Sequence, residues 1–89
     1  MKDARAWAAP LPRRIEPDDP EFRKLAVGAW RDMAQSRGAT VEVTAIHRWL
    51  TTHIADVTVD GVPYVLATVK IDGWHQVIAW LESDVSGVG

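Results

Sequence analysis

The stretch from Val57 to Leu81, VTVDGVPYVLATVKIDGWHQVIAWL, contains the strongest structural signal in the chain. Asp-Gly pairs at positions 60–61 and 72–73 each lie between runs that are rich in β-branched and aromatic residues. Both central residues of a two-residue type I′ hairpin turn need positive φ angles, which Asp and Gly adopt readily. The stretch therefore predicts a three-stranded antiparallel meander with its turns at these two pairs.

The register of this meander predicts which side chains share a face. If both turns contain two residues, Val59 pairs with Val62 and Ile71 pairs with Trp74, and side chains then alternate between the two faces. One face, which suits packing against a helix, carries Ala55, Val57, Val59, Val62, Tyr64, Leu66, Val77, Ala79 and Leu81. The opposite face carries Ile54, Val65, Ala67, Val69, Ile71, Trp74, Ile78 and Trp80. This second face is more apolar than a sheet face in contact with water should be.

Upstream of the meander, residues 20–37 have the pattern of an amphipathic helix. Asp19 can accept hydrogen bonds from free amides, Pro20 suits the first helical position, and Gly38 is a typical stop. The apolar residues recur at helical spacing and form the stripe that we expect to cover the sheet. The stripe consists of Phe22, Leu25, Ala26, Ala29, Trp30, Met33 and Ala34.

The segment before this helix predicts an extended arm. Residues 1–19 hold three of the five prolines and show neither helical nor strand periodicity. Two interpretations remain open, because a Pro-rich polar segment can stay disordered, whereas Trp7, Leu11 and Ile15 could lie in a groove.

The chain therefore predicts an α+β domain with one helix and a four-stranded, mainly antiparallel sheet. The domain is expected to span residues 20–83, with a flexible tail at 84–89. The strands are expected at residues 40–49, 54–60, 62–71 and 74–82.

An alternative architecture remains open, because residues 45–54 and 74–83 also fit helical spacing. The order of helix, strand, helix, hairpin and helix resembles a winged helix, which implies a DNA-binding regulator with a basic N-terminal arm. The charges oppose this alternative, since few basic residues accompany the recognition helix that it requires. The residues that would contact DNA are Arg5, Arg13, Arg14 and Arg48.

Composition bounds the class of protein. Eighty-nine residues, 47% hydrophobic and 25% charged, are typical of one small globular domain, and the absence of cysteine excludes a disulfide framework and a thiolate site. The net charge of −2 gives no overall attraction to nucleic acid or anionic lipid. With neither a membrane-spanning run nor a signal peptide in the sequence, we expect a cytoplasmic protein. Seven arginines, three lysines and no asparagine are typical of a GC-rich actinobacterium or one of its phages.

The chain shows no recognisable catalytic motif. His47, His53 and His75 have acidic residues nearby in sequence that could complete a metal site or an acid/base pair, namely Asp56, Glu42 and Glu82. Their spacing fits no established metal motif. No serine lies in a nucleophile elbow, and no glycine-rich loop precedes a helix to hold phosphate. We therefore expect no enzymatic activity, no cofactor and no metal site.

Tryptophan is the most informative residue type for function. Five of the seven aromatic residues are tryptophan, which is enriched at binding hot spots. We expect a small protein–protein interaction module that buries its second sheet face in a homodimer or against another protein, with neither nucleic acid nor membrane as partner. The expected contact residues are Trp74, Trp80, Ile78, Val69, Ile71, Val65 and Trp7.

Overall fold

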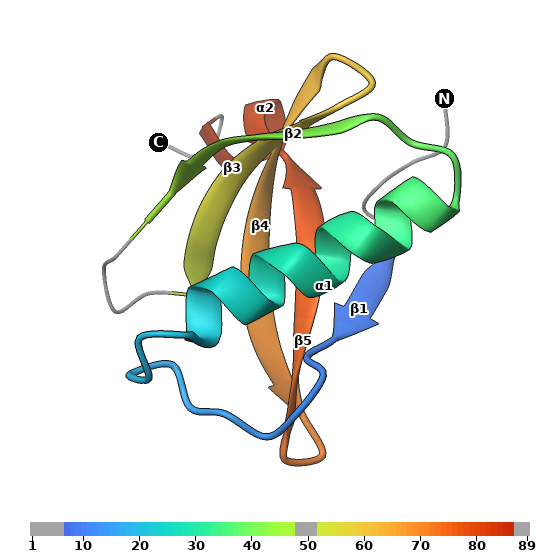
Figure 1. Cartoon of the computed structure of the whole chain (residues 1–89). Coiled ribbons are helices and arrows are strands. Elements are labelled where there is room, and N and C mark those ends of the chain that lie inside the picture. Colours follow the sequence, from blue (N-terminus) through green and yellow to red (C-terminus); the bar gives the residue numbers. More distant parts are fainter. Residues whose placement is uncertain (1–6, 48–51, 87–89) are drawn as a thin grey trace.

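The computed structural model describes residues 7–47 and 52–86, which form one antiparallel sheet of five strands and two helices. In the sheet the strands follow the order β1-β5-β4-β3-β2, and α1 lies across one face (Figure 1). The predicted α+β class is confirmed, but the predicted number of strands was wrong, because part of the N-terminal arm adds a fifth. The elements are β1 (Ala8–Pro10), α1 (Phe22–Ser36), β2 (Val41–Ile46), β3 (His53–Val59), β4 (Val62–Ile71), β5 (Trp74–Leu81) and α2 (Glu82–Ser86).

The two Asp-Gly turns build the centre of the sheet as predicted. Val59 pairs with Val62, and Ile71 pairs with Trp74. All four turn residues have positive φ angles, which are 50° and 81° at positions 60 and 61, and 52° and 77° at positions 72 and 73. Both hairpins therefore have the two-residue turns that the register prediction required.

The winged-helix alternative is wrong at its C-terminal helix, because Trp74–Leu81 forms strand β5. Both ends of its second helix are also extended, since residues 45–46 belong to β2 and residues 53–54 belong to β3. Residues 48–51, between these two strands, lie outside the described residues. Pairing with neighbouring strands on both sides outweighs the helical spacing of the apolar residues in β5.

Replacing Gly61 by alanine should destabilise the fold by about 1 kcal/mol, since an L-residue is strained at this positive φ angle. An added Cβ would meet no atom within 4 Å, so the cost is conformational and not steric. Gly28 is a matched control, because it lies within α1 and an added Cβ there also meets nothing. Gly28→Ala should stabilise the fold by about 0.5–1 kcal/mol. Urea unfolding of both variants should give shifts of opposite sign, and a stabilising Gly61→Ala would contradict the assigned turn.

Helix α1 ends just before the predicted stop at Gly38, but its N-cap is Glu21 and not Asp19, so the helix begins at Phe22 and not at the predicted Pro20. The Asp19 carboxylate accepts a hydrogen bond from the backbone N–H of Glu21 at 2.9 Å, and the helix starts at the next residue. At its other end Gly38 has a φ angle of 89°, and the N–H of Ala39 donates to the carbonyl of Ala34 at 3.1 Å. These contacts are those of a Schellman motif.

The buried face of α1 includes most of the predicted stripe. Two residues outside that stripe, Arg23 and Val27, are buried as well. Leu25 and Met33 are partly buried at its edge. The fully packed residues are Phe22, Arg23, Ala26, Val27, Trp30 and Ala34.

The arm from Trp7 to Ile15 lies in a groove instead of extending into solvent. Ala9 pairs with Val77 in the β1–β5 ladder, and the side chains of Trp7, Leu11 and Ile15 are buried in the core. The Trp7 carbonyl accepts a hydrogen bond from the indole N–H of Trp30 in α1 at 3.2 Å. The arm therefore closes one edge of the sheet and completes the core beside the helix.

Ile54 was predicted on the second sheet face, and this prediction was wrong. The register between β3 and β4 shifts between His53 and Ala55, so that β3 contains a bulge at this point. The bulge turns Ile54 into the core, where its side chain is fully buried.

No helix within the described residues has the length and apolar character that crossing a membrane would require.

Candidate functional site

The sheet face opposite α1 is the first candidate site, and we call it the open face. In Figure 1, α1 lies in front of β3, β4 and β5, so their opposite face points away from the viewer. Strand alternation and the observed pairings show which side chains of β1, β5 and β4 lie on this face. They are Ala8, Pro10, Trp74, Gln76, Ile78, Trp80, Pro63, Val65, Ala67, Val69 and Ile71. None of these side chains is charged.

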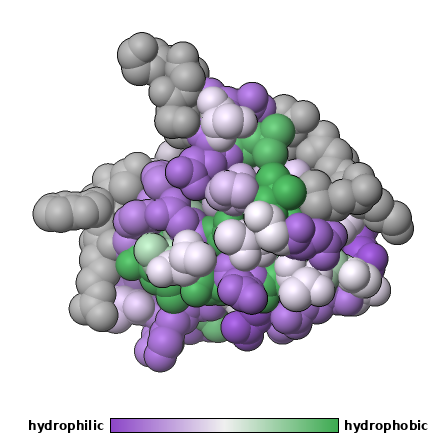
Figure 2. Space-filling view, turned by 90° about the horizontal axis from the view of Figure 1, so that it is seen from above, coloured by the Kyte–Doolittle hydropathy of each residue, from purple (hydrophilic) through white to green (hydrophobic). Residues whose placement is uncertain are grey.

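Three large apolar side chains of the open face remain accessible to solvent. Val69, Ile71 and Trp80 are 37%, 51% and 44% exposed. Val65, which pairs with Trp80, is buried but lies outside the main core cluster. Seen from above, by contrast, the molecule is mostly hydrophilic, with its hydrophobic residues in small groups (Figure 2).

The structure brings six of the seven predicted contact residues to the open face and places the seventh elsewhere. Trp7 is buried in the core beneath α1, so it cannot belong to that surface. Trp74 is half-buried, because its indole N–H donates to the carbonyl of Leu11 at 2.8 Å and the Arg14 guanidinium lies 5.4 Å from the ring centre. Trp74 therefore secures the arm to the sheet.

A cluster of His47, His53 and Asp56 is the second candidate site, and we call it the His–Asp cluster. Nε2 of His47 lies 3.0 Å from Oδ2 of Asp56, and Nε2 of His53 lies 2.9 Å from Oδ1. The two imidazole rings are 4.4 Å apart and meet edge to face. All three side chains are half-buried. Their possible metal-binding atoms all lie within 4.8 Å of one another.

The bulge in β3 explains why these residues meet. Residues three apart on a regular strand point to opposite faces, so His53 and Asp56 should be separated. The extra residue at Ile54 returns both side chains to the open face, where His53 pairs with Ala67 and Asp56 pairs with Val65. The sequence offers no signal for this bulge.

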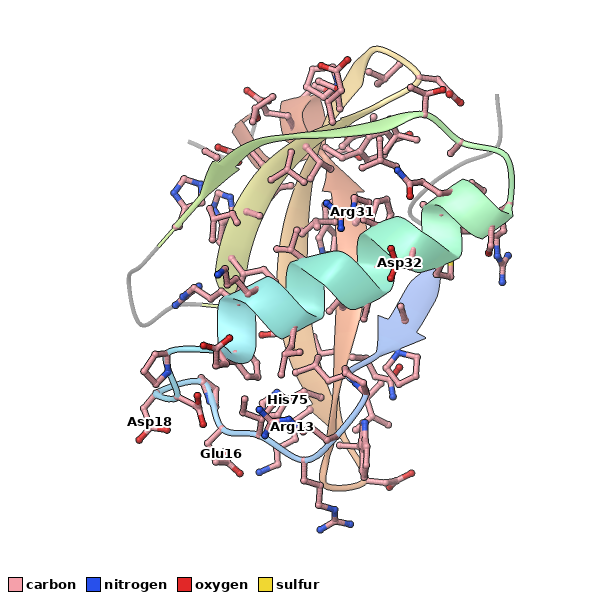
Figure 3. All side chains as sticks on the ribbon, in the orientation of Figure 1. Arg13, Glu16, Asp18, Arg31, Asp32 and His75 are labelled. Carbon is pink, nitrogen blue, oxygen red and sulfur yellow. The ribbon has the colours of Figure 1, made fainter. Side chains whose placement is uncertain are left out.

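A basic pocket beneath the start of α1 is the third candidate site. It has a volume of about 170 Å³. Glu16 lies 3.7 Å from the Lys70 ammonium and 3.9 Å from Nε2 of His75. Arg13 lines the same pocket, and Figure 3 shows it with Glu16 and His75 on one side of α1. Its lining residues are Arg13, Arg14, Ile15, Glu16, Lys70, Gly73, Trp74 and His75.

Within this pocket His75 is unusual. Among residues 7–47 and 52–86, neither ring nitrogen has a hydrogen-bond partner. The ring packs edge to face against Phe22 at 5.1 Å. Arg13 and Arg14, two of the arginines predicted for DNA contact, line this small pocket close to the acidic Glu16. Arg5 and Arg48 lie outside the described residues.

Comparisons with protein-family models, with curated proteins and with solved structures found no match to this chain. Function is therefore inferred from the geometry of the three sites.

Proposed function

We propose that this protein is a non-enzymatic protein-binding module that self-associates through its open face. The observation that carries the proposal is the exposure of Val69, Ile71 and Trp80 on the paired strands β4 and β5, whose side chains on the open face are all uncharged. Burying such side chains is favourable by about 25 cal/mol per Å² of apolar surface. A small domain gains from covering them, because its own core is thin.

The absence of charge on the β1, β5 and β4 part of the open face favours a second copy of this chain as the partner, although Asp56 lies beside this part on β3. In a two-fold dimer the same patch meets itself, so the patch must complement its own surface. Apolar side chains such as Ile71 and Ile78 meet this requirement, whereas a strongly charged patch would repel its copy. The indole of Trp80 can serve as the anchor, since tryptophan buries a large rigid area.

The size of the face indicates that the dimer is weak. Strands β1, β5 and β4 have 3, 8 and 10 residues. With a rise of about 3.4 Å per residue and a strand spacing of about 4.8 Å, they cover roughly 340 Å². A stable interface buries about 800 Å² on each partner. The contact is therefore expected to be reversible, with a dissociation constant on the order of micromolar or higher.

Light scattering during size-exclusion chromatography tests this function. The measured mass should rise from 9.9 kDa toward twice that value as the protein concentration increases. The useful range runs from about 1 μM to about 500 μM. A constant mass of 9.9 kDa throughout would contradict self-association and leave a different protein as the partner of the open face.

A further inference from the structure

We propose that the His–Asp cluster binds one Zn²⁺ ion through His47, His53 and Asp56. This inference does not depend on self-association, and it departs from the sequence-based expectation that the chain holds no metal.

The distances between the donor atoms suit a metal ion. In a tetrahedral zinc site with bonds of about 2.0–2.1 Å, neighbouring donor atoms lie roughly 3.3 Å apart. Each imidazole Nε2 lies 2.9 or 3.0 Å from a different oxygen of Asp56. All three donor atoms lie within 4.8 Å of one another, so side-chain rotation is needed to bring one oxygen and both nitrogens to bonding distance around a common centre.

The backbone around the cluster is fixed by hydrogen bonds. His53 and Asp56 lie on β3, and the N–H of His47 donates to the carbonyl of Ile54 at 2.8 Å. The Thr44 hydroxyl donates to the carbonyl of Asp56 at 3.1 Å. Two of the three ligands lie on β3, and His47 directly follows the end of β2. A site on such paired backbone loses less conformational entropy on binding than one assembled from a loop.

The type of donor atom selects the metal. Two imidazole nitrogens with one carboxylate suit zinc and its neighbours among the transition metals, whereas Mg²⁺ and Ca²⁺ prefer oxygen ligands. The three side chains are half-buried, so an ion can enter from solvent. Three protein ligands also leave at least one coordination position for water.

Equilibrium dialysis of the full chain, with any histidine tag removed, tests the site. We expect Zn²⁺ to saturate at one ion per chain, with a dissociation constant on the order of 10 μM or tighter, and excess Mg²⁺ should not compete. His47→Gln, His53→Gln and Asp56→Asn should each weaken binding by at least about tenfold. His75→Gln is the control, because His75 lies on the helix side of the sheet, and it should leave the zinc affinity unchanged.

NMR of the wild-type protein keeps the proposal testable if a variant fails to fold. Zn²⁺ should shift the imidazole signals of His47 and His53 and leave those of His75 in place. Failure of zinc to saturate at one ion per chain would overturn the proposal. Equal shifts at all three histidines, or unchanged affinity in the folded ligand variants, would overturn it as well.

Discussion

Deleting residues 1–15 is expected to unfold the domain. The truncation removes β1 and the buried side chains of Trp7, Leu11 and Ile15. Burying each large apolar side chain contributes about 1.5–3 kcal/mol, so these three contribute roughly 5–9 kcal/mol. This loss matches the entire stability of a typical domain, about 5–15 kcal/mol. Far-UV circular dichroism and amide NMR dispersion should show loss of the native state at 25 °C.

Two features of the remaining chain add to the loss. The buried indole N–H of Trp30 loses its acceptor when the Trp7 carbonyl is removed, which costs about 1–3 kcal/mol. The edge of β5 also loses its pairing partner. Deleting residues 1–6 alone is the matched control, because it removes none of the described core residues. A chain of residues 16–89 that melts cooperatively at the wild-type temperature would contradict the assigned role of the arm.

The same reasoning changes how DNA binding by the arm should be tested. Deleting residues 1–15 would abolish any affinity through unfolding, whether or not the arginines contact DNA. Replacing Arg13 and Arg14 by glutamine leaves the buried residues of the arm intact, since both arginine side chains are exposed. Binding that survives this double substitution would not come from these arginines.

The two hairpins could be predicted because their signals are local. An Asp-Gly turn specifies its own backbone angles, and a two-residue loop specifies the register of both strands that it joins. Once Val59 pairs with Val62, alternation assigns the faces as far as the first bulge. The placement of Val69, Ile71 and Trp80 on one face of the sheet follows from these rules.

Strand β1 and the His–Asp cluster could not be predicted by the same rules. Ala8–Pro10 is only three residues long, and its pairing is decided by β5 at the far end of the chain. The cluster depends on the bulge at Ile54, where strict alternation fails and His53 joins Asp56 on one face. Trp74 likewise lies on the predicted face, but its indole N–H is taken by the Leu11 carbonyl, a contact that only the folded arm provides.

Replacing Trp80 by alanine should weaken self-association strongly while leaving the fold intact. An anchoring tryptophan at the centre of an interface contributes about 2 kcal/mol or more, so the dissociation constant should rise by about 30-fold or more. The fold should lose much less, because Trp80 is 44% exposed and contributes mainly a cross-strand pair with Val65. Such a pair contributes about 0.2–1 kcal/mol. Sedimentation equilibrium and urea unfolding of the monomer would measure the two effects separately.

Ile46 offers the matched control for this substitution. Its side chain is 45% exposed, close to the 44% of Trp80. Ile46 lies on the edge strand β2 and pairs with Ala55, so it is not on the open face. Ile46→Ala should therefore leave the dissociation constant of the dimer unchanged.

If Trp80 belonged to the core instead, its truncation would cost the fold about 3–5 kcal/mol at every protein concentration. A dimer's unfolding midpoint depends on concentration and a monomer's does not, so urea unfolding at two concentrations separates an interface residue from a core residue.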